Sequence, residues 1–213
     1  MAIAAKICGL SSEVAVEAAV AGGAAFVGFV FYPPSPRSIA PARAGELCTL
    51  VPASMKRVAL FVDPDNAAIE TVLEAAPIDI LQFHGAETPE RVIRVKERFG
   101  RQVMKAISIA SPEDVAAAGR YEDVADLLLF DAKPPPAATR PGGNGLIFDW
   151  QLIAGRQWRL PWMLSGGLTA ELLPEAVRIS GARAVDVSSG VERKPGDKDP
   201  EKIRAFLEVA RGL

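Results

Sequence analysis

Cysteine and histidine are scarce in this chain, and positive charge is not concentrated anywhere along it. The 213 residues include two cysteines and one histidine, and the formal net charge is −2. Two cysteines far apart in sequence provide no disulfide framework, and a single histidine without ligands at suitable spacing argues against a zinc site. We therefore expect a reducing, cytoplasmic setting, no metal, no nucleic-acid partner and no membrane partner.

Long uninterrupted apolar runs are also absent. The longest apolar stretch, Val14–Phe31, contains Glu17 and the pair Gly22-Gly23. A membrane-spanning helix needs about 20 consecutive apolar residues, so this stretch is typical of a helix, a turn and a strand instead.

Short apolar runs alternate with amphipathic stretches along the whole chain. The runs that predict strands are Ala4–Cys8, Ala25–Phe31, Met55–Val62, Ile78–Phe83, Gln102–Ile107, Leu127–Phe130, Pro161–Leu164 and Ala184–Val187. Stretches with helical features begin near Ser12, Pro41, Ala67, Thr88, Ser111, Asp149, Thr169 and Pro200. This alternation predicts a (β/α)8 barrel of the α/β class, with residues 1–213 forming one monofunctional domain. A doubly wound open sheet is the alternative, although no Gly-x-Gly-x-x-Gly pattern follows the first strand.

Two ionisable side chains stand where predicted strands end, and barrel enzymes place their chemistry there. Cys8 is either a small buried apolar residue or a thiolate that acts as a base or nucleophile. Asp131 is either a solvated carboxylate or an acid that desolvation keeps protonated. If the faces that carry Cys8 and Asp131 point inward, the two side chains share one pocket and suit proton transfer on a small phosphorylated substrate.

The last two predicted strands both end in small residues. These residues make tight turns, or they let backbone N–H groups approach an anion. Because the loops after strands seven and eight of a barrel often hold a phosphate, we expect a phosphate site there. Its residues are Gly166, Gly167, Ser188, Ser189 and Gly190.

Three further features surround the predicted pocket. Arg37 is the only cation in the proline-rich segment 32–38, and it is either a surface arginine or a fork for a ligand carboxylate. We expect His84 at the rim of the pocket, in a structural rather than a catalytic role. The segment Ala132–Phe148 is too long for an ordinary connection, and it is either a disordered insertion or a lid over the substrate.

Seven stretches carry a family resemblance. In chain order they are KICGL (6–10), FYPPSPRSI (31–39), LQFHG (81–85), LLLFDAK (127–133), GGNGLIFDW (142–150), LSGGL (164–168) and AVDVSSGVE (184–192). Together they span nearly the whole chain, which resembles the phosphoribosylanthranilate isomerase family of tryptophan biosynthesis. The chain departs from the family's more common Asp-Thr-Lys pattern at Ala132 and in the three prolines that follow Lys133.

The resemblance implies a cofactor-free Amadori rearrangement of N-(5-phosphoribosyl)anthranilate to 1-(2-carboxyphenylamino)-1-deoxyribulose 5-phosphate. It makes Asp131 the general acid that opens the ribose ring and Cys8 the general base that removes the proton from C2. It also implies that Arg37 holds the anthranilate carboxylate, that the two small-residue turns hold the phosphate, and that Asp186 lies near the sugar hydroxyls. Such an enzyme would act as a monomer or a homodimer.

These roles require Cys8 to be a thiolate while Asp131 keeps its proton, which reverses the order in which free thiols and carboxyls ionise. We expect Lys6, on the same strand face, to lower the pKa of the thiol, and desolvation to keep the carboxyl protonated. Two alternatives stay open: another sugar-phosphate isomerase of the same fold, and a barrel that binds a phosphorylated ligand without catalysis.

Overall fold

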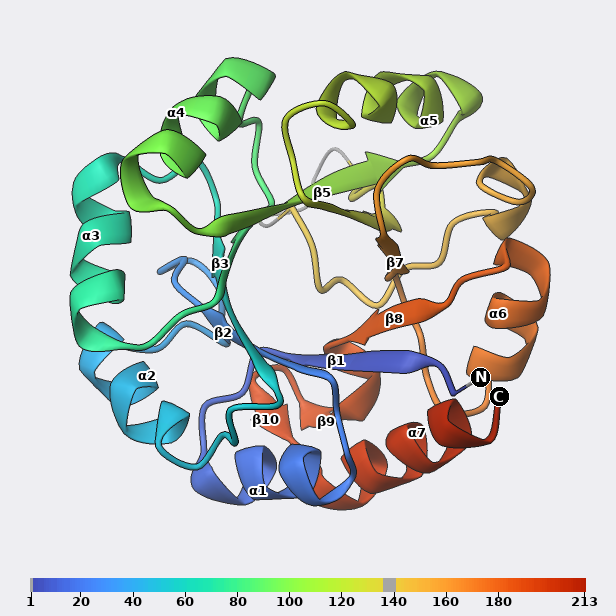
Figure 1. Cartoon of the computed structure of the whole chain (residues 1–213). Coiled ribbons are helices and arrows are strands. Elements are labelled where there is room, and N and C mark those ends of the chain that lie inside the picture. The colour runs from blue at the N-terminus through green and yellow to red at the C-terminus, as the bar shows by residue number, and fades with distance from the viewer. Residues whose placement is uncertain (1, 136–140) are drawn as a thin grey trace.

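A closed barrel of parallel strands forms the centre of the molecule (Figure 1). The computed structural model describes residues 2–135 and 141–213. The barrel strands follow sequence order and are β1 (Ala4–Cys8), β2 (Phe26–Val30), β3 (Lys56–Phe61), β4 (Ile80–Phe83), β5 (Gln102–Ile109), β6 (Leu127–Ala132), β7 (Trp162–Leu164) and β8 (Ala184–Val187). Parallel pairing of β1 with β8 closes the barrel and sets Lys6 opposite Asp186. The (β/α)8 prediction is confirmed, and the open-sheet alternative is wrong.

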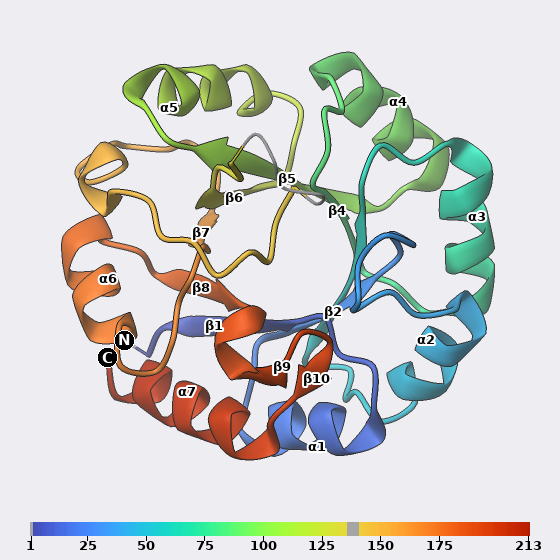
Figure 2. The same ribbon diagram turned by 180° about the vertical axis from the view of Figure 1, so that it is seen from behind.

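Helices form a ring around this barrel in both views of the molecule (Figures 1 and 2). They are α1 (Glu13–Ala21), α2 (Pro41–Cys48), α3 (Asn66–Ala75), α4 (Pro89–Phe99), α5 (Pro112–Ala118), α6 (Leu173–Ser180) and α7 (Pro200–Gly212). Local chemistry sets several of their ends: Thr88 Oγ1 accepts the Arg91 N–H at the start of α4, and Gly100 ends that helix in the left-handed conformation.

One expected helix is wrong. The segment that begins at Asp149 makes only a single 3-10 turn, η2 (Trp150–Leu152), and this turn occupies the place between α5 and α6 in the ring (Figure 1). Asp149 does cap the turn, because its Oδ1 accepts the Gln151 N–H at 2.9 Å. The chain then turns toward β7, so the cap starts a turn that is not continued as an α-helix.

A small hairpin lies between β8 and α7. The 3-10 turn η3 (Ser189–Val191) leads into β9 (Glu192–Lys194), which pairs antiparallel with β10 (Asp197–Lys198). The turn of the hairpin lies against the loop after β2. A Cβ on Gly196 would be only 2.4 Å from the Pro36 carbonyl oxygen, which shows how closely the two loops pack. The hairpin therefore joins two loops at the mouth of the barrel.

Two apolar clusters surround the strands. The larger one lies between sheet and helices, and the smaller one fills the barrel interior with Val58, Ile80, Met104, Ala106, Leu129 and Met163. Leu129 lies in this inner cluster, which confirms that the strand face carrying Asp131 points inward. Polar groups continue these inward faces toward the carboxyl ends of the strands, where the cavity described below opens.

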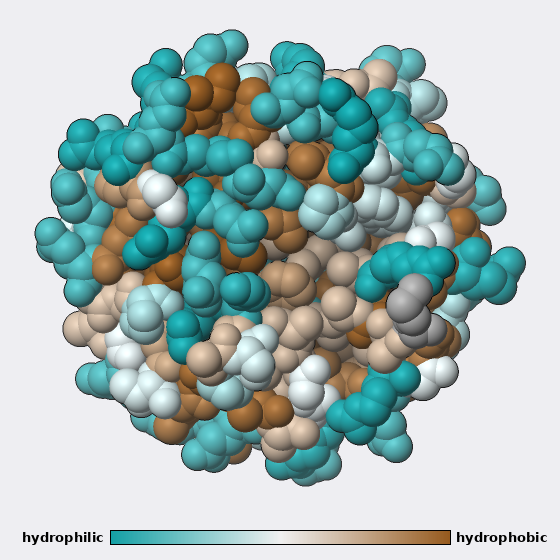
Figure 3. Space-filling model, in the orientation of Figure 1, coloured by the Kyte–Doolittle hydropathy of each residue, from teal (hydrophilic) through white to brown (hydrophobic). Residues whose placement is uncertain are grey.

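The outer surface is mixed in character. On the face shown in Figure 3, hydrophilic residues break up the apolar areas, as expected for an outer layer of amphipathic helices. Within residues 2–135 and 141–213, no helix is long and apolar enough to cross a membrane. The backbone N–H of Ile3 donates to the Ala210 carbonyl at 3.1 Å, which ties the start of the chain to α7.

Candidate active site

One cavity lies at the carboxyl ends of the barrel strands, with a volume of about 750 Å³ including its open mouth. It is lined by nearly every residue that the sequence predicted for the site: Cys8, Arg37, His84, Asp131, Gly166, Gly167, Asp186, Ser188 and Ser189. Gly190 is not among the lining residues. A Cβ there would lie 1.9 Å from the Leu168 carbonyl oxygen, so close backbone packing alone requires a glycine.

Cys8 is a buried thiol with a buried ion pair beside it. The Lys6 ammonium lies 2.8 Å from Asp186 Oδ1, and the two side chains are 0% and 5% exposed. Burial raises the pKa of the Cys8 thiol and Asp186 adds to this effect, whereas Lys6 and Lys198 lower the pKa by less. Lys6 thus lowers the thiol's pKa as expected, but desolvation outweighs this effect and the net shift of the pKa is upward.

A glycine on the neighbouring strand makes room for this arrangement. Gly28 pairs with Cys8 across β1 and β2, and a Cβ on Gly28 would lie 3.1 Å from both Cys8 Sγ and Lys6 Nζ. Such contacts are tighter than packed side chains normally make, and any larger residue at this position would displace the thiol or the ammonium.

Asp131 accepts a hydrogen bond from the backbone of the next residue, and the only histidine lies beside it. The Ala132 N–H donates to Asp131 Oδ1 at 2.8 Å, and His84 Nε2 lies 3.2 Å from Asp131 Oδ2. Gln82 Nε2 lies 3.3 Å from the other ring nitrogen, His84 Nδ1. His84 is therefore a buried residue of the cavity lining beside the proposed acid, and its ring nitrogens face Asp131 and Gln82.

Arg37 is buried and already holds a carboxylate from this chain. Its Nε donates to Glu192 Oε1 at 2.7 Å, and its Nη2 donates to Glu192 Oε2 at 2.8 Å. The Gly143 carbonyl accepts a further hydrogen bond from Nη2 at 3.2 Å. The surface-arginine alternative is therefore wrong. The guanidinium lines the cavity, and most of its N–H donors already bind Glu192 and Gly143.

The two small-residue turns lie at the same mouth. Gly166 and Gly167 have φ values of 93° and 63°, a left-handed backbone that glycine adopts without strain. The Ser188 hydroxyl donates to the Cys8 carbonyl at 3.1 Å and accepts from Lys198 Nζ at the same distance. The Ser188 hydroxyl is thus engaged within the protein, whereas Ser189 and the backbone N–H groups of these turns line the cavity mouth and can donate to an anion.

The segment after β6 crosses the barrel opening in both views (yellow in Figures 1 and 2). Residues 136–140 of the expected lid lie outside the described residues. In the described part, a Cβ on Gly142 would lie 2.6 Å from His84 Nε2 and 2.9 Å from Asp131 Oδ2. A Cβ on Gly167 would lie 2.7 Å from Ile147 Cγ1. The segment therefore touches both the proposed acid and one proposed phosphate turn.

Three residues of this site were missing from the sequence-based prediction: Gly28, Glu192 and Lys198. The Pro-Gly pair at 195–196 between charged residues could have indicated the hairpin that carries the last two. The partners themselves are far apart in sequence, so no local pattern reveals them. Within the part of the chain that the structure describes, no group of three or more His, Cys, Asp or Glu side chains could hold a metal ion.

The fold and the cavity together define a class. A closed parallel barrel that gathers a thiol, a carboxyl, a buried arginine and two glycine turns at the carboxyl ends of its strands is a (β/α)8-barrel enzyme for a small anionic ligand.

Comparison with known proteins specifies the family. The family model of N-(5'phosphoribosyl)anthranilate (PRA) isomerase matches residues 5–209. The N-(5'-phosphoribosyl)anthranilate isomerase of Paramagnetospirillum magneticum is 55% identical over 212 residues, which cover 100% of this chain and 99% of the relative. The chain belongs to the N-(5'-phosphoribosyl)anthranilate isomerase family.

Solved structures agree with this assignment. Phosphoribosyl anthranilate isomerase from Thermotoga maritima matches with a TM-score of 0.88 and 35% identity, over 99% of this chain and 100% of that chain. A phosphoribosyl anthranilate isomerase in complex with reduced 1-(o-carboxyphenylamino)-1-deoxyribulose 5-phosphate matches with a TM-score of 0.86 and 34% identity, over the same shares of the two chains.

Proposed function

We propose that this chain catalyses the Amadori rearrangement of N-(5'-phosphoribosyl)anthranilate in tryptophan biosynthesis, with Asp131 as general acid and Cys8 as general base. The observation that carries the assignment of roles is that both groups line one cavity from inward strand faces, β6 and β1. The product is 1-(2-carboxyphenylamino)-1-deoxyribulose 5-phosphate.

The acid step opens the sugar ring. Asp131 gives a proton to the ribose ring oxygen as the bond from that oxygen to C1 breaks, and the nitrogen lone pair forms a Schiff base at C1. His84, 3.2 Å from Asp131 Oδ2, lies where it can orient the carboxyl. General acid catalysis of this kind contributes about 10²- to 10⁴-fold to a rate.

The base step moves the double bond. The Cys8 thiolate removes the proton from C2 to give an enolamine, which becomes the ketone when the C2 hydroxyl loses its proton and C1 gains one. Because burial raises the pKa of Cys8, the thiolate is a minor form at neutral pH, but it is a stronger base than an ordinary thiolate.

Charge complementarity supports the binding roles. Arg37 is assigned to the anthranilate carboxylate, and the turns at Gly166-Gly167 and at Ser188–Gly190 are assigned to the phosphate through their backbone N–H groups. Asp186 faces the cavity between them, where it would contact sugar hydroxyls. A cytoplasmic location and a monomeric or homodimeric state stay predictions, as does the absence of a cofactor.

The direct test is turnover of freshly generated phosphoribosylanthranilate, followed by the loss of its anthranilate-type fluorescence. The proposal predicts loss that depends on enzyme concentration and yields the ketose. If the protein bound the substrate and left the fluorescence unchanged, it would be a phosphate-ligand-binding barrel without this activity.

A further inference from the structure

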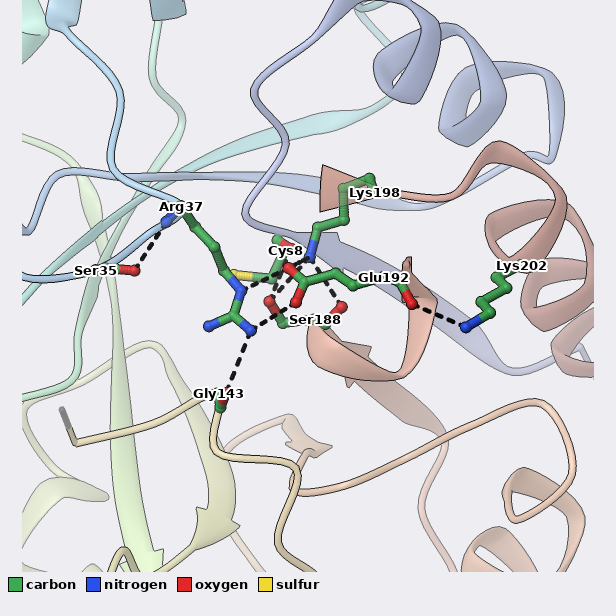
Figure 4. A network of polar contacts seen from close by, with 8 residues as sticks. All are labelled: Cys8, Ser35, Arg37, Gly143, Ser188, Glu192, Lys198 and Lys202. Carbon is green, nitrogen blue, oxygen red and sulfur yellow. Dashed lines mark hydrogen bonds and ion pairs between the residues drawn. The ribbon is translucent and has the colours of Figure 1, made fainter. Parts of the chain in front are cut away.

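A buried network of three charges stands beside the thiol (Figure 4). It consists of Arg37 from the loop after β2, and Glu192 and Lys198 from the two strands of the hairpin. Lys198 Nζ donates to Glu192 Oε1 at 2.8 Å, and the two side chains are 1% and 4% exposed. Lys198 also donates to the Ser188 carbonyl at 2.8 Å. The mechanism above gives Glu192 and Lys198 no task.

The geometry limits how a ligand can use Arg37. A guanidinium has five N–H donors, of which Glu192 occupies the Nε donor and one on Nη2, and Gly143 occupies the other on Nη2. The bonds to Glu192 and Gly143 leave out Nη1. Gly143 packs against Nη1, since a Cβ on Gly143 would lie 2.3 Å from this atom. A ligand carboxylate that displaces Gly143 from the guanidinium could therefore bind Nη1 and Nη2 together. Glu192 thus fixes which edge of the guanidinium faces the ligand.

Lys198 determines the net charge of the network that faces the ligand. With Arg37 and Lys198 protonated and Glu192 ionised, the three side chains carry one net positive charge. Burial alone would raise the pKa of Glu192, but the hydrogen bonds and charges of Arg37 and Lys198 lower it, so this carboxylate stays ionised. Without Lys198, Glu192 would neutralise Arg37 and leave no net charge for a ligand carboxylate.

We propose that Glu192 and Lys198 are positioning residues for the carboxylate site: Glu192 holds the Arg37 guanidinium by its Nε–Nη2 edge, and Lys198 offsets the charge of Glu192. This inference rests on the proposed role of Arg37 in binding the anthranilate carboxylate. It makes the hairpin β9–β10 a determinant of specificity for substrates that carry this carboxylate.

Glu192 is itself an anion that repels a ligand carboxylate. Burial lowers the pKa of Lys198 to about 8, and Glu192 opposes this lowering. When Glu192→Gln removes that charge, Lys198 gives up its proton more readily, and the network again carries about one positive charge. The loss of the guanidinium anchor then decides the outcome, so ligand binding weakens.

The experiment compares two ligands by calorimetric titration of the full chain. One is 1-(2-carboxyphenylamino)-1-deoxyribulose 5-phosphate, and the other is the phenylamino analogue that lacks the carboxylate. We expect Glu192→Gln and Lys198→Met each to weaken the carboxylated ligand about tenfold and to leave the other ligand within about twofold. Lys198→Arg keeps the charge and should restore binding. Asp197→Asn, which removes an exposed ion pair with Arg193 in the same hairpin, is the matched control.

Arg37→Lys distinguishes the proposed carboxylate-binding role of Arg37 from the positioning role of Glu192 and Lys198. If Arg37→Lys leaves the preference for the carboxylated ligand intact, the proposed role of Arg37 fails and this inference fails with it. If Arg37→Lys abolishes the preference while Glu192→Gln and Lys198→Met affect both ligands equally, affect neither, or strengthen the carboxylated one, only the positioning role is overturned. Should either single variant fail to fold, the double variant Glu192→Gln/Lys198→Met removes both charges together and carries the same expectation.

Discussion

The ammonium of Lys6 is bound to the carboxylate of Asp186 at 2.8 Å inside the barrel, on the strand face that also carries Cys8. Lys6 is therefore not a free cation next to the thiol. Although burial alone would lower the pKa of Lys6, the charges and hydrogen bonds of Asp186 and Cys8 raise it above its ordinary range. The pair is a fixed dipole at the base of the cavity, and its positive end still favours the thiolate.

The activity should depend on pH less steeply than the thiolate fraction of Cys8. The base must be deprotonated, and because burial raises the pKa of Cys8, the thiolate fraction keeps increasing above the pH at which an ordinary thiol has ionised. The acid must keep its proton, so the gain in thiolate is offset by the loss of protonated Asp131, and we expect no steep rise of kcat between about pH 7 and pH 9. A kcat that rose about tenfold per pH unit over this range would show that the reaction needs a deprotonated base but no protonated acid.

Alkylation measures the pKa of Cys8 directly. The rate of reaction with iodoacetamide should follow the thiolate fraction of Cys8, measured in a Cys48→Ser variant so that one thiol reports. Burial raises the pKa of Cys48 to about 11, so this second thiol would otherwise complicate the titration at high pH.

Removing Lys6 should cost stability as well as activity. Lys6→Met leaves Asp186 buried without its partner, and such a loss typically lowers the free energy of unfolding by about 3–5 kcal/mol. Lys96→Met removes a partly exposed ion pair with Asp126 and should cost about 1 kcal/mol or less. Urea denaturation of both variants checks this prediction, and equal losses would contradict it.

Gly28 should tolerate no side chain. A methyl group there would lie 3.1 Å from both Cys8 Sγ and Lys6 Nζ, so Gly28→Ala should destabilise the protein by about 1–3 kcal/mol and lower kcat by displacing the base. Gly212→Ala near the C-terminus meets no atom within 4 Å and serves as the control. Wild-type values of kcat and Tm for Gly28→Ala would mean that the thiol has more room than the structure shows.

The barrel itself could be predicted from the sequence, because apolar runs buried on both faces are a strong local signal. The predicted bounds Ala184–Val187 of the last strand agree with β8. The hairpin was not predicted, because Glu192-Arg193-Lys194 contains no apolar residue and so shows no strand periodicity. The helix expected at Asp149 was wrong because a capping residue starts a turn whether or not a helix follows.

Most residues of the site could be named from the sequence, but their electrostatics could not. Strand ends in a barrel converge, which predicted that Cys8, Asp131 and Arg37 gather at one cavity. The partner of Arg37 is 155 positions away, and that of Lys6 is 180 positions away. The balance between burial and charge at Cys8 depends on these distant partners, so the direction of its pKa shift required the structure.

The central claim is that Cys8 and Asp131 perform the proton transfers, and single-variant kinetics on phosphoribosylanthranilate test it most directly. Each of Cys8→Ala and Asp131→Ala should lower kcat by about 10²- to 10⁴-fold while KM stays within a few-fold of wild type, because neither residue is assigned to the anionic groups of the substrate. If both variants retained near wild-type kcat, the two groups would not be the base and the acid, and the account of this site would be wrong.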